Sequence, residues 1–331
     1  PTLLVHRTPL ILFQSRDLAS RDIYQACCTL ELPCHSELLA WPQKPARRAS
    51  GTMLDTRDFG SIAFSGGGAR GVCLIGAVRA LLLAEPKLLS RVNCFSGVSI
   101  GALMATCCAF GRLPDDIDAA FRGSGMRAAF SPPALDFWTS RAMNTQDKLE
   151  EGLRSFLVGL RIRPEATLAD VRTLTGKTII FVAASLKTGL VVHLGPDTTP
   201  RLALIEALLC TMCMPVVFPP RPLGDDLLID GGVLDPLPSN CFPGERALCM
   251  SVCDTDDCDD SWHAYLGRLC FIGGANRLAE RARDGHYGRP GAGAALVNIS
   301  LEGIPVGFIP PQGMTMDGLL SISGLGFVAA L

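Results

Sequence analysis

The sequence predicts an α/β fold, in which helices pack against a layered core of strands. Two observations lead to this prediction. Apolar runs of strand length alternate with stretches of helical periodicity, and a chain of 331 residues is long enough to bury a substantial core. The composition agrees with a packed interior, because 48% of the residues are hydrophobic and 19% are charged. The net charge is -2 and no basic domain stands out, so no nucleic-acid partner is expected.

The chain is predicted to divide into an N-terminal extension, residues 1–57, and a main domain, residues 58–331. Scattered prolines and the basic stretch PARRAS at 45–50 indicate that the extension is partly irregular. The most apolar run, from Leu202, is interrupted by Glu206 and is too short to predict a membrane span. The first residues lack the pattern of a secretory signal. We therefore expect an intracellular protein, cytoplasmic or peripherally associated with a membrane.

From residue 61 onward, the pattern predicts an ordered series of elements. Short apolar runs bounded by turn residues indicate strands, and apolar residues spaced three or four apart indicate helices. In chain order, we expect a strand at 61–65, a helix at 72–84, a strand at 92–97, helices at 100–110 and 147–158, two strands within 177–195, a helix at 202–213, and strands at 226–230 and 246–254.

The fourteen cysteines indicate buried free thiols rather than disulfides or a zinc site. Adjacent pairs such as Cys107–Cys108, and cysteines within apolar segments, are typical of core thiols in a reducing compartment. The pair Cys210–Cys213 has neither a second C-x-x-C pair nor nearby histidines in the sequence. The acidic stretch Asp254–Asp260 lacks the central glycine and terminal glutamate of a calcium loop. We therefore expect no bound metal.

Ser99 lies in a G-x-S-x-G frame between a predicted strand and a predicted helix. A nucleophile on such a sharp turn has a strained backbone, so the residues two before and two after it must be small. Gly97 and Gly101 meet this need. The hydroxyl would then lie at the amino end of a helix, whose dipole stabilises developing negative charge. The frame therefore predicts a nucleophilic serine.

The loop SGGGARG, which begins at Ser65, offers backbone N–H groups to an anion. A dinucleotide site would require an acidic residue at the end of the next strand, but that strand ends in the serine turn. A phosphate-binding loop would require a Lys-Ser/Thr pair after the glycines, where this sequence has none. Acyl transfer, in contrast, needs donors beside the nucleophile. We therefore predict that Gly66, Gly67 and Gly68 form an oxyanion hole.

The base that would activate the serine is either an aspartate or a histidine. A Ser–Asp–His order would use His263 or His286, although neither lies in a distinctive context. Asp230 ends the apolar strand DLLID and is followed by Gly231 and Gly232, which permit a tight turn. An aspartate in a partly dry pocket beside a serine accepts its proton directly when the aspartate pKa is raised.

The motifs GGGARG, GVSIG and DGG, in this order, resemble those of the patatin-like phospholipases, over about Phe59 to Asp254. Those proteins are lipid acyl hydrolases with a Ser–Asp dyad, on a three-layer α/β/α fold with a mostly parallel central sheet. The resemblance implies that residues 58–331 form a catalytic domain that needs no cofactor, with Ser99 as nucleophile and Asp230 as base. The supporting motif residues would be Ala69, Arg70, Gly71, Gly97, Gly101, Gly231 and Gly232.

Four positions call for comment beside this resemblance. Arg70 occupies the basic position of the glycine loop, where it would either steady a substrate phosphate or form a structural ion pair. Cys210 and Thr211 stand where the family usually has small residues, often Ala-Ser, and Asp235 stands where Asn is usual. These departures concern packing around the aspartate loop, so they bear on substrate shape more than on the dyad.

The resemblance implies hydrolysis of fatty-acyl esters in phospholipids or lysophospholipids, at a membrane surface that a peripheral enzyme reaches. A transacylase or a neutral-lipid lipase would use the same residues. A patatin-like domain with weak turnover could instead serve as an effector or binding module. The irregular stretch Met126–Trp138 places aromatic residues around two prolines, and it is either a lid that meets lipid or part of the core.

Overall fold

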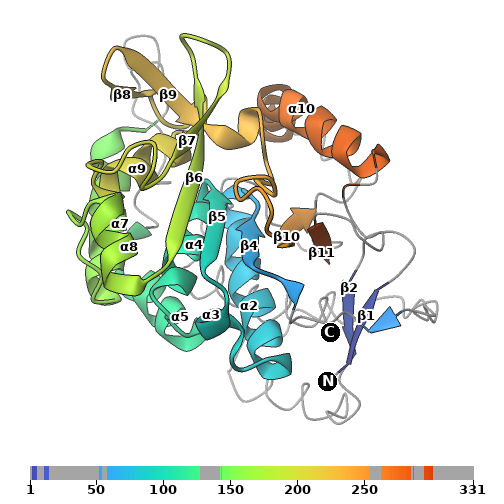
Figure 1. The fold of residues 1–331 in the computed structure, drawn as a ribbon. Helices are drawn as coiled ribbons and strands as arrows, with labels where there is room; N and C mark the ends of the chain where they lie inside the picture. Colours follow the sequence, from blue (N-terminus) through green and yellow to red (C-terminus); the bar gives the residue numbers. More distant parts are fainter. Residues whose placement is uncertain are drawn as a thin grey trace, which may run out of the picture.

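An eight-stranded, mostly parallel sheet forms the centre of the protein (Figure 1). The structure is a computed structural model, and it describes residues 2–5, 11–14, 52–53, 58–126, 142, 144–253, 262–284, 286 and 294–300. The strands β11, β10, β4, β5 and β6 lie side by side in parallel, whereas β7, β8 and β9 pair antiparallel beyond β6. The strands are β4 (Ser61–Phe64), β5 (Cys94–Val98), β6 (Thr178–Ser185), β7 (Val191–Leu194), β8 (Arg221–Leu223), β9 (Asp226–Asp230), β10 (Ala247–Cys253) and β11 (Ala294–Ser300).

Side chains alternate between the two faces of this sheet, as strand geometry requires. In β4, Ile62 and Phe64 belong to the large hydrophobic core, whereas Ala63 belongs to a smaller cluster. In β10, Leu248 contributes to the large core and Cys249 to the small cluster. Each face of the sheet is therefore covered by its own layer.

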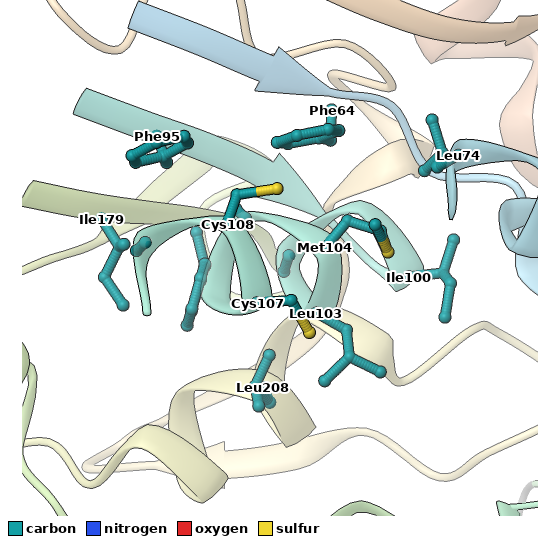
Figure 2. Close-up of a cluster of buried hydrophobic side chains, with 14 of the residues drawn as sticks. Phe64, Leu74, Phe95, Ile100, Leu103, Met104, Cys107, Cys108, Ile179 and Leu208 are labelled. Atoms are coloured by element: carbon teal, nitrogen blue, oxygen red, sulfur yellow. The ribbon is translucent and has the colours of Figure 1, made fainter. Parts of the chain in front are cut away.

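Most of the helices cover the face that contributes to the large core. They are α2 (Cys73–Ala84), α3 (Leu88–Arg91), α4 (Ile100–Ala109), α5 (Pro114–Gly123), α7 (Gln146–Gly159), α8 (Leu168–Thr175) and α9 (Leu204–Met212). Figure 2 shows α4 between the sheet and α9: Cys108 and Met104 lie beneath the strand phenylalanines, and Cys107 points toward Leu208 of α9. All ten residues of α4 are buried, which explains why its sequence is apolar on every side.

The opposite face is covered by α10 (Trp262–Arg283). Its residue Leu278 packs against the smaller cluster, which includes Ala63, Cys249 and Leu296. Sequence analysis did not predict this helix, because Gly273 and Gly274 interrupt its middle and glycine disfavours helices. With α10 in place, the protein has the three-layer α/β/α architecture and mostly parallel sheet that the sequence predicted, and this fold class is confirmed.

The elements expected between residues 61 and 254 are present, with ends that differ by at most two residues. Besides α10, the sequence analysis missed α3, α5, α8 and the strands β8 and β11. A signal for α8 was available, because Thr167 and Asp170 form a capping box at its start. The described thiols are free, as expected, and burial raises the pKa of Cys108 to about 12.

Within the N-terminal extension, the structure describes only the backbone of three short strands. They are β1 (Thr2–Val5), β2 (Ile11–Gln14) and β3 (Thr52–Met53), and they form a separate antiparallel sheet. The boundary at residues 57/58 stays a prediction. Of the segment Met126–Trp138, expected to be a lid or part of the core, only Met126 is among the described residues. The acidic stretch Asp254–Asp260 also lies outside the described residues. Within the part of the chain that the structure describes, no helix has the length and hydropathy of a membrane span.

Candidate active site

Ser99 forms a strained turn between β5 and α4. Its backbone angles are φ 55° and ψ −129°, and residues other than glycine rarely adopt such a positive φ. The turn leaves no space for side chains at the two flanking glycines. A Cβ on Gly97 would lie 2.3 Å from the Gly101 carbonyl oxygen, and a Cβ on Gly101 would lie 2.4 Å from the Ser65 carbonyl oxygen. The G-x-S-x-G frame is thus a steric requirement of this turn.

Thr211, near the end of α9, holds the backbone of this turn. Its Oγ1 accepts a hydrogen bond from the Ser99 N–H at 3.0 Å and donates one to the Val182 carbonyl oxygen. The Thr211 side chain is fully buried, so neither group has water as an alternative partner. The sequence analysis noted Thr211 only as a departure from a family pattern and missed this contact, which joins residues 112 positions apart.

Asp230, at the end of β9, carries a buried carboxylate. Its Oδ1 accepts a hydrogen bond from the Gly232 N–H at 2.8 Å, and its own N–H donates to the Cys213 carbonyl oxygen. Burial raises the pKa of Asp230 to about 6, although hydrogen bonds from the Ser99 hydroxyl and the Gly232 N–H act in the opposite direction. Near neutral pH the carboxylate is therefore largely ionised, yet basic enough to take up a proton.

The strand β6 brings Ser99 and Asp230 together. Val98, the last residue of β5, pairs with Val182, and the following residue Ala183 pairs with Asp230. The two turns therefore leave the sheet at nearly the same level, one on each side of β6. The Ser99 hydroxyl interacts with the Asp230 carboxylate and lowers its pKa, which opposes the effect of burial. The two residues that the sequence predicted as a dyad are thus neighbours.

The glycine loop lies beside this pair. Its hydrogen bonds show which of its backbone N–H groups are available to an oxyanion. The Gly66 N–H donates to the Pro236 carbonyl oxygen at 3.1 Å, so it is engaged within the protein. Among the described residues, the N–H groups of Gly67 and Gly68 donate to no acceptor. A Cβ on Gly66 would lie 3.5 Å from the Cβ of Ser99, which places the loop next to the nucleophile. An oxyanion hole formed by this loop would therefore use Gly67 and Gly68, rather than all three predicted glycines.

The last residues of the loop, 69–71, are buried and packed against the serine turn. A Cβ on Gly71 would lie 2.1 Å from the Ile100 side chain, so glycine is required where the loop meets the start of α4. Ala69 and Arg70 are also buried, and desolvation lowers the pKa of Arg70 to about 10. On the other side, a Cβ on Gly231 would lie 2.3 Å from the Val182 carbonyl oxygen. Glycine thus permits a close approach on both sides of the site, to a side chain at Gly71 and to backbone at Gly231.

None of the described contacts joins His263 or His286 to Ser99 or Asp230. The His286 Nε2 lies 3.1 Å from the Ser239 Oγ, and burial lowers the pKa of this imidazole. The backbone of His263 lies in α10, and its side chain is outside the described residues. Across the described positions, no group of three or more histidine, cysteine or acidic side chains is arranged to hold a metal ion.

Comparison with known protein families identifies the chain. A family model of patatin-like phospholipases matches residues 62–240, which is more than half of the sequence. The chain belongs to the patatin-like phospholipase family. The matched segment includes the glycine loop, Ser99 and Asp230, but ends before α10. Membership supports a lipid ester hydrolase and implies a lipid substrate.

Individual relatives of this patatin-like protein are distant. The uncharacterized protein R571 of Acanthamoeba polyphaga mimivirus is 24% identical over 207 residues, which cover 60% of this chain and 67% of that protein. The probable lipid hydrolase 463L of Invertebrate iridescent virus 6 is 22% identical over 188 residues, which cover 56% of this chain and 63% of that protein. The match therefore spans about two thirds of the length of each viral protein.

Two solved structures align with 82% of the chain. VipD from Legionella pneumophila aligns at 16% identity with a TM-score of 0.45, over 67% of its own chain. The type III effector ExoU, from Pseudomonas aeruginosa, aligns at 16% identity with a TM-score of 0.39, over 52% of its own chain.

Proposed function

We propose that this protein is a lipid acyl hydrolase of phospholipase A or lysophospholipase type, which cleaves fatty-acyl esters through an acyl-enzyme formed on Ser99. The observation that carries the proposal is that a hydroxyl on a strained strand-to-helix turn lies beside a buried carboxylate with a raised pKa, one on each side of β6. This combination meets the two needs of nucleophilic catalysis. The sharp turn presents the serine hydroxyl to a substrate carbonyl, and the neighbouring carboxylate can accept its proton.

The dyad would work in two steps. In the first, the Ser99 Oγ bonds to the ester carbonyl carbon while Asp230 takes the hydroxyl proton. The Gly67 and Gly68 N–H groups stabilise the tetrahedral oxyanion. When the intermediate collapses, the ester C–O bond breaks and Asp230 returns the proton to the departing alcohol. In the second step, water attacks the acyl-enzyme, Asp230 takes the water proton, and collapse returns the proton to Ser99 and releases the fatty acid.

The substrate is proposed to be a phospholipid or another acyl lipid, which the enzyme meets at a membrane surface as a peripheral protein. Family membership supports the lipid class. A transacylase or neutral-lipid lipase would use the same dyad, and the acyl acceptor and headgroup distinguish these activities. Arg70, buried beside the glycine loop, stays a candidate either for contact with a substrate phosphate or for a structural ion pair.

The test is labelling with a fluorophosphonate, followed by mapping of the modified residue, together with hydrolysis of phospholipid vesicles and of a soluble short-chain ester. We expect labelling at Ser99 and release of free fatty acid. Ser99→Ala and Asp230→Asn should each lower hydrolysis by on the order of 10⁴-fold, whereas His286→Ala should retain it. A folded wild-type protein that is neither labelled nor hydrolytic would support an effector or binding module instead. Loss of activity in His286→Ala would support a histidine base.

A further inference from the structure

The helix α10 contains two adjacent glycines, Gly273 and Gly274, near its middle. Each glycine in a helix interior costs about 1 kcal/mol relative to alanine, so a pair of them needs a reason in packing. The reason is a close contact with the turn that follows Asp230. A Cβ on Gly274 would lie 2.3 Å from the Gly232 carbonyl oxygen and 2.8 Å from Pro236. Only a glycine lets the helix approach this turn so closely.

The same face of α10 makes two further contacts with this segment. The Phe271 ring approaches Gly232 so closely that a Cβ there would lie 3.1 Å from its Cε1. At the other end of the face, the Arg281 guanidinium binds the Asp235 carboxylate through two hydrogen bonds of 2.8 Å, and also donates to the Leu237 carbonyl oxygen. Spacings of three and seven residues place these three positions of α10 on one helical face.

The contact has a direct path to the candidate base, because Gly232 is the residue whose N–H holds the Asp230 carboxylate at 2.8 Å. We propose that α10 is a clamp on the aspartate turn, in which Gly274 and Arg281 are positioning residues that keep the Gly232 N–H aimed at Asp230. This inference rests on the proposed function. It extends the site to a helix that begins after the segment matched by the family model, which ends at residue 240.

The clamp also accounts for Asp235, where the family pattern usually has Asn. A carboxylate at this position binds both arms of the Arg281 guanidinium, which an amide cannot match in charge or geometry. The two side chains are mostly buried, with 6% of the Asp235 side chain and 16% of the Arg281 side chain exposed. The departure from the family pattern is therefore explained by a partner on α10.

The closing experiment compares Gly274→Ala with Gly123→Ala, which makes the same chemical change at the end of α5, where a Cβ has open space. Hydrolysis of a soluble short-chain ester is measured across pH, with the melting temperature as a check on folding. We expect Gly274→Ala to lower kcat about tenfold with little change in KM, and Gly123→Ala to match the wild type.

The pH profile separates positioning from general loss of structure. Loss of the Gly232 hydrogen bond removes a contact that favours the charged carboxylate, so the pKa of Asp230 rises and the acidic limb of the profile moves to higher pH. Besides Gly232, the Ser99 hydroxyl acts on Asp230. Asp230 in turn raises the pKa of the Cys213 thiol, which at about 12 stays neutral. A merely structural role would lower the amount of active enzyme without moving this limb.

Arg281→Lys provides a second variant in case Gly274→Ala does not fold. Lysine keeps the charge and loses the two-armed geometry, so we expect a smaller shift in the same direction. An acidic limb that stays at the wild-type pH in the folded variants would overturn the clamp. An inactive wild-type protein that the fluorophosphonate also fails to label would overturn the proposed function, and the clamp with it.

Discussion

The serine turn and the aspartate turn differ in where their shape is determined. The serine turn is constrained by its own residues and by the sheet, because Gly97 meets the Gly101 carbonyl and Gly101 meets the end of the neighbouring strand β4. The aspartate turn is contacted by α10, from residues about forty positions later in the chain. The serine turn is therefore shaped within the turn and the sheet, whereas the aspartate turn also depends on the third layer of the fold.

The two turns also differ in the kind of energetic cost that each carries in the folded protein. Ser99 has a strained backbone, which surrounding glycine contacts and the Thr211 hydrogen bond maintain. Asp230 has an ordinary position at a strand end, but its carboxylate is removed from water and therefore has a raised pKa. The first cost is steric and independent of pH, whereas the second is electrostatic and depends on it.

The largest expected effect comes from Gly101→Ala, which tests the steric fit of the serine turn against the sheet. Its Cβ would lie 2.4 Å from the Ser65 and 2.5 Å from the Phe64 carbonyl oxygens, and backbone atoms cannot move aside as a flexible side chain would. We expect the melting temperature to fall by about 10 °C or more, with fluorophosphonate labelling nearly lost. Gly159→Ala, whose Cβ would meet Ala120 at an ordinary 3.6 Å, is the control and should leave both unchanged. A stable, reactive Gly101→Ala protein would show that the serine turn is not sterically set.

Next in size is Gly68→Ala, which tests the loop between the two turns. Gly68 has φ +54°, so alanine is strained there and would turn the proposed oxyanion donors. We expect kcat to fall by about a hundredfold, as when an oxyanion donor is removed. Gly67→Ala should have a milder effect, because its Cβ would meet Gly71 and Val252 at ordinary distances of 3.5 and 3.6 Å. Equal kcat values for Gly68→Ala and wild type would remove the loop from the mechanism.

The comparison also explains how far the sequence predicted the site. The G-x-S-x-G frame, the glycine loop and the strand that ends in Asp230 are local patterns, and in the structure Ser99 and Asp230 lie at neighbouring positions beside β6. The engagement of the Gly66 N–H by Pro236 could not be read locally, because it joins residues 170 positions apart. The role of Thr211 and the packing of α10 on Gly232 were missed for the same physical reason: each is a contact between layers, and periodicity reports only which face of an element is apolar.

Thr211→Val tests how much the serine turn depends on a residue that is distant in sequence. In this respect the serine turn resembles the aspartate turn. Valine keeps the shape but removes the acceptor for the Ser99 N–H and the donor to Val182, and both groups would stay buried. We expect kcat to fall about tenfold with KM nearly constant. Thr211→Ser keeps the hydroxyl and is the matched control, with expected activity within about twofold of wild type. If Thr211→Val keeps wild-type activity while Thr211→Ser loses it, packing of the γ-methyl group rather than the hydrogen bond holds the turn.

The last prediction concerns stability, and it tests the electrostatic cost of the aspartate turn. The pKa of Asp230 rises from 3.8 to about 6 on folding, so its stabilising contribution is fully present below about pH 3.8 and is lost as pH rises through about 6. A shift of about two units corresponds to about 3 kcal/mol, as an upper value. Asp230→Asn should therefore melt at a higher temperature than wild type at pH 8, with the difference shrinking as pH falls to 4, although the variant is inactive. Ser99→Ala removes a hydrogen bond to the charged carboxylate and should shift stability at pH 8 in the opposite direction. An Asp230→Asn protein that is less stable than wild type by the same amount at both pH values would mean that the buried carboxylate carries no such cost.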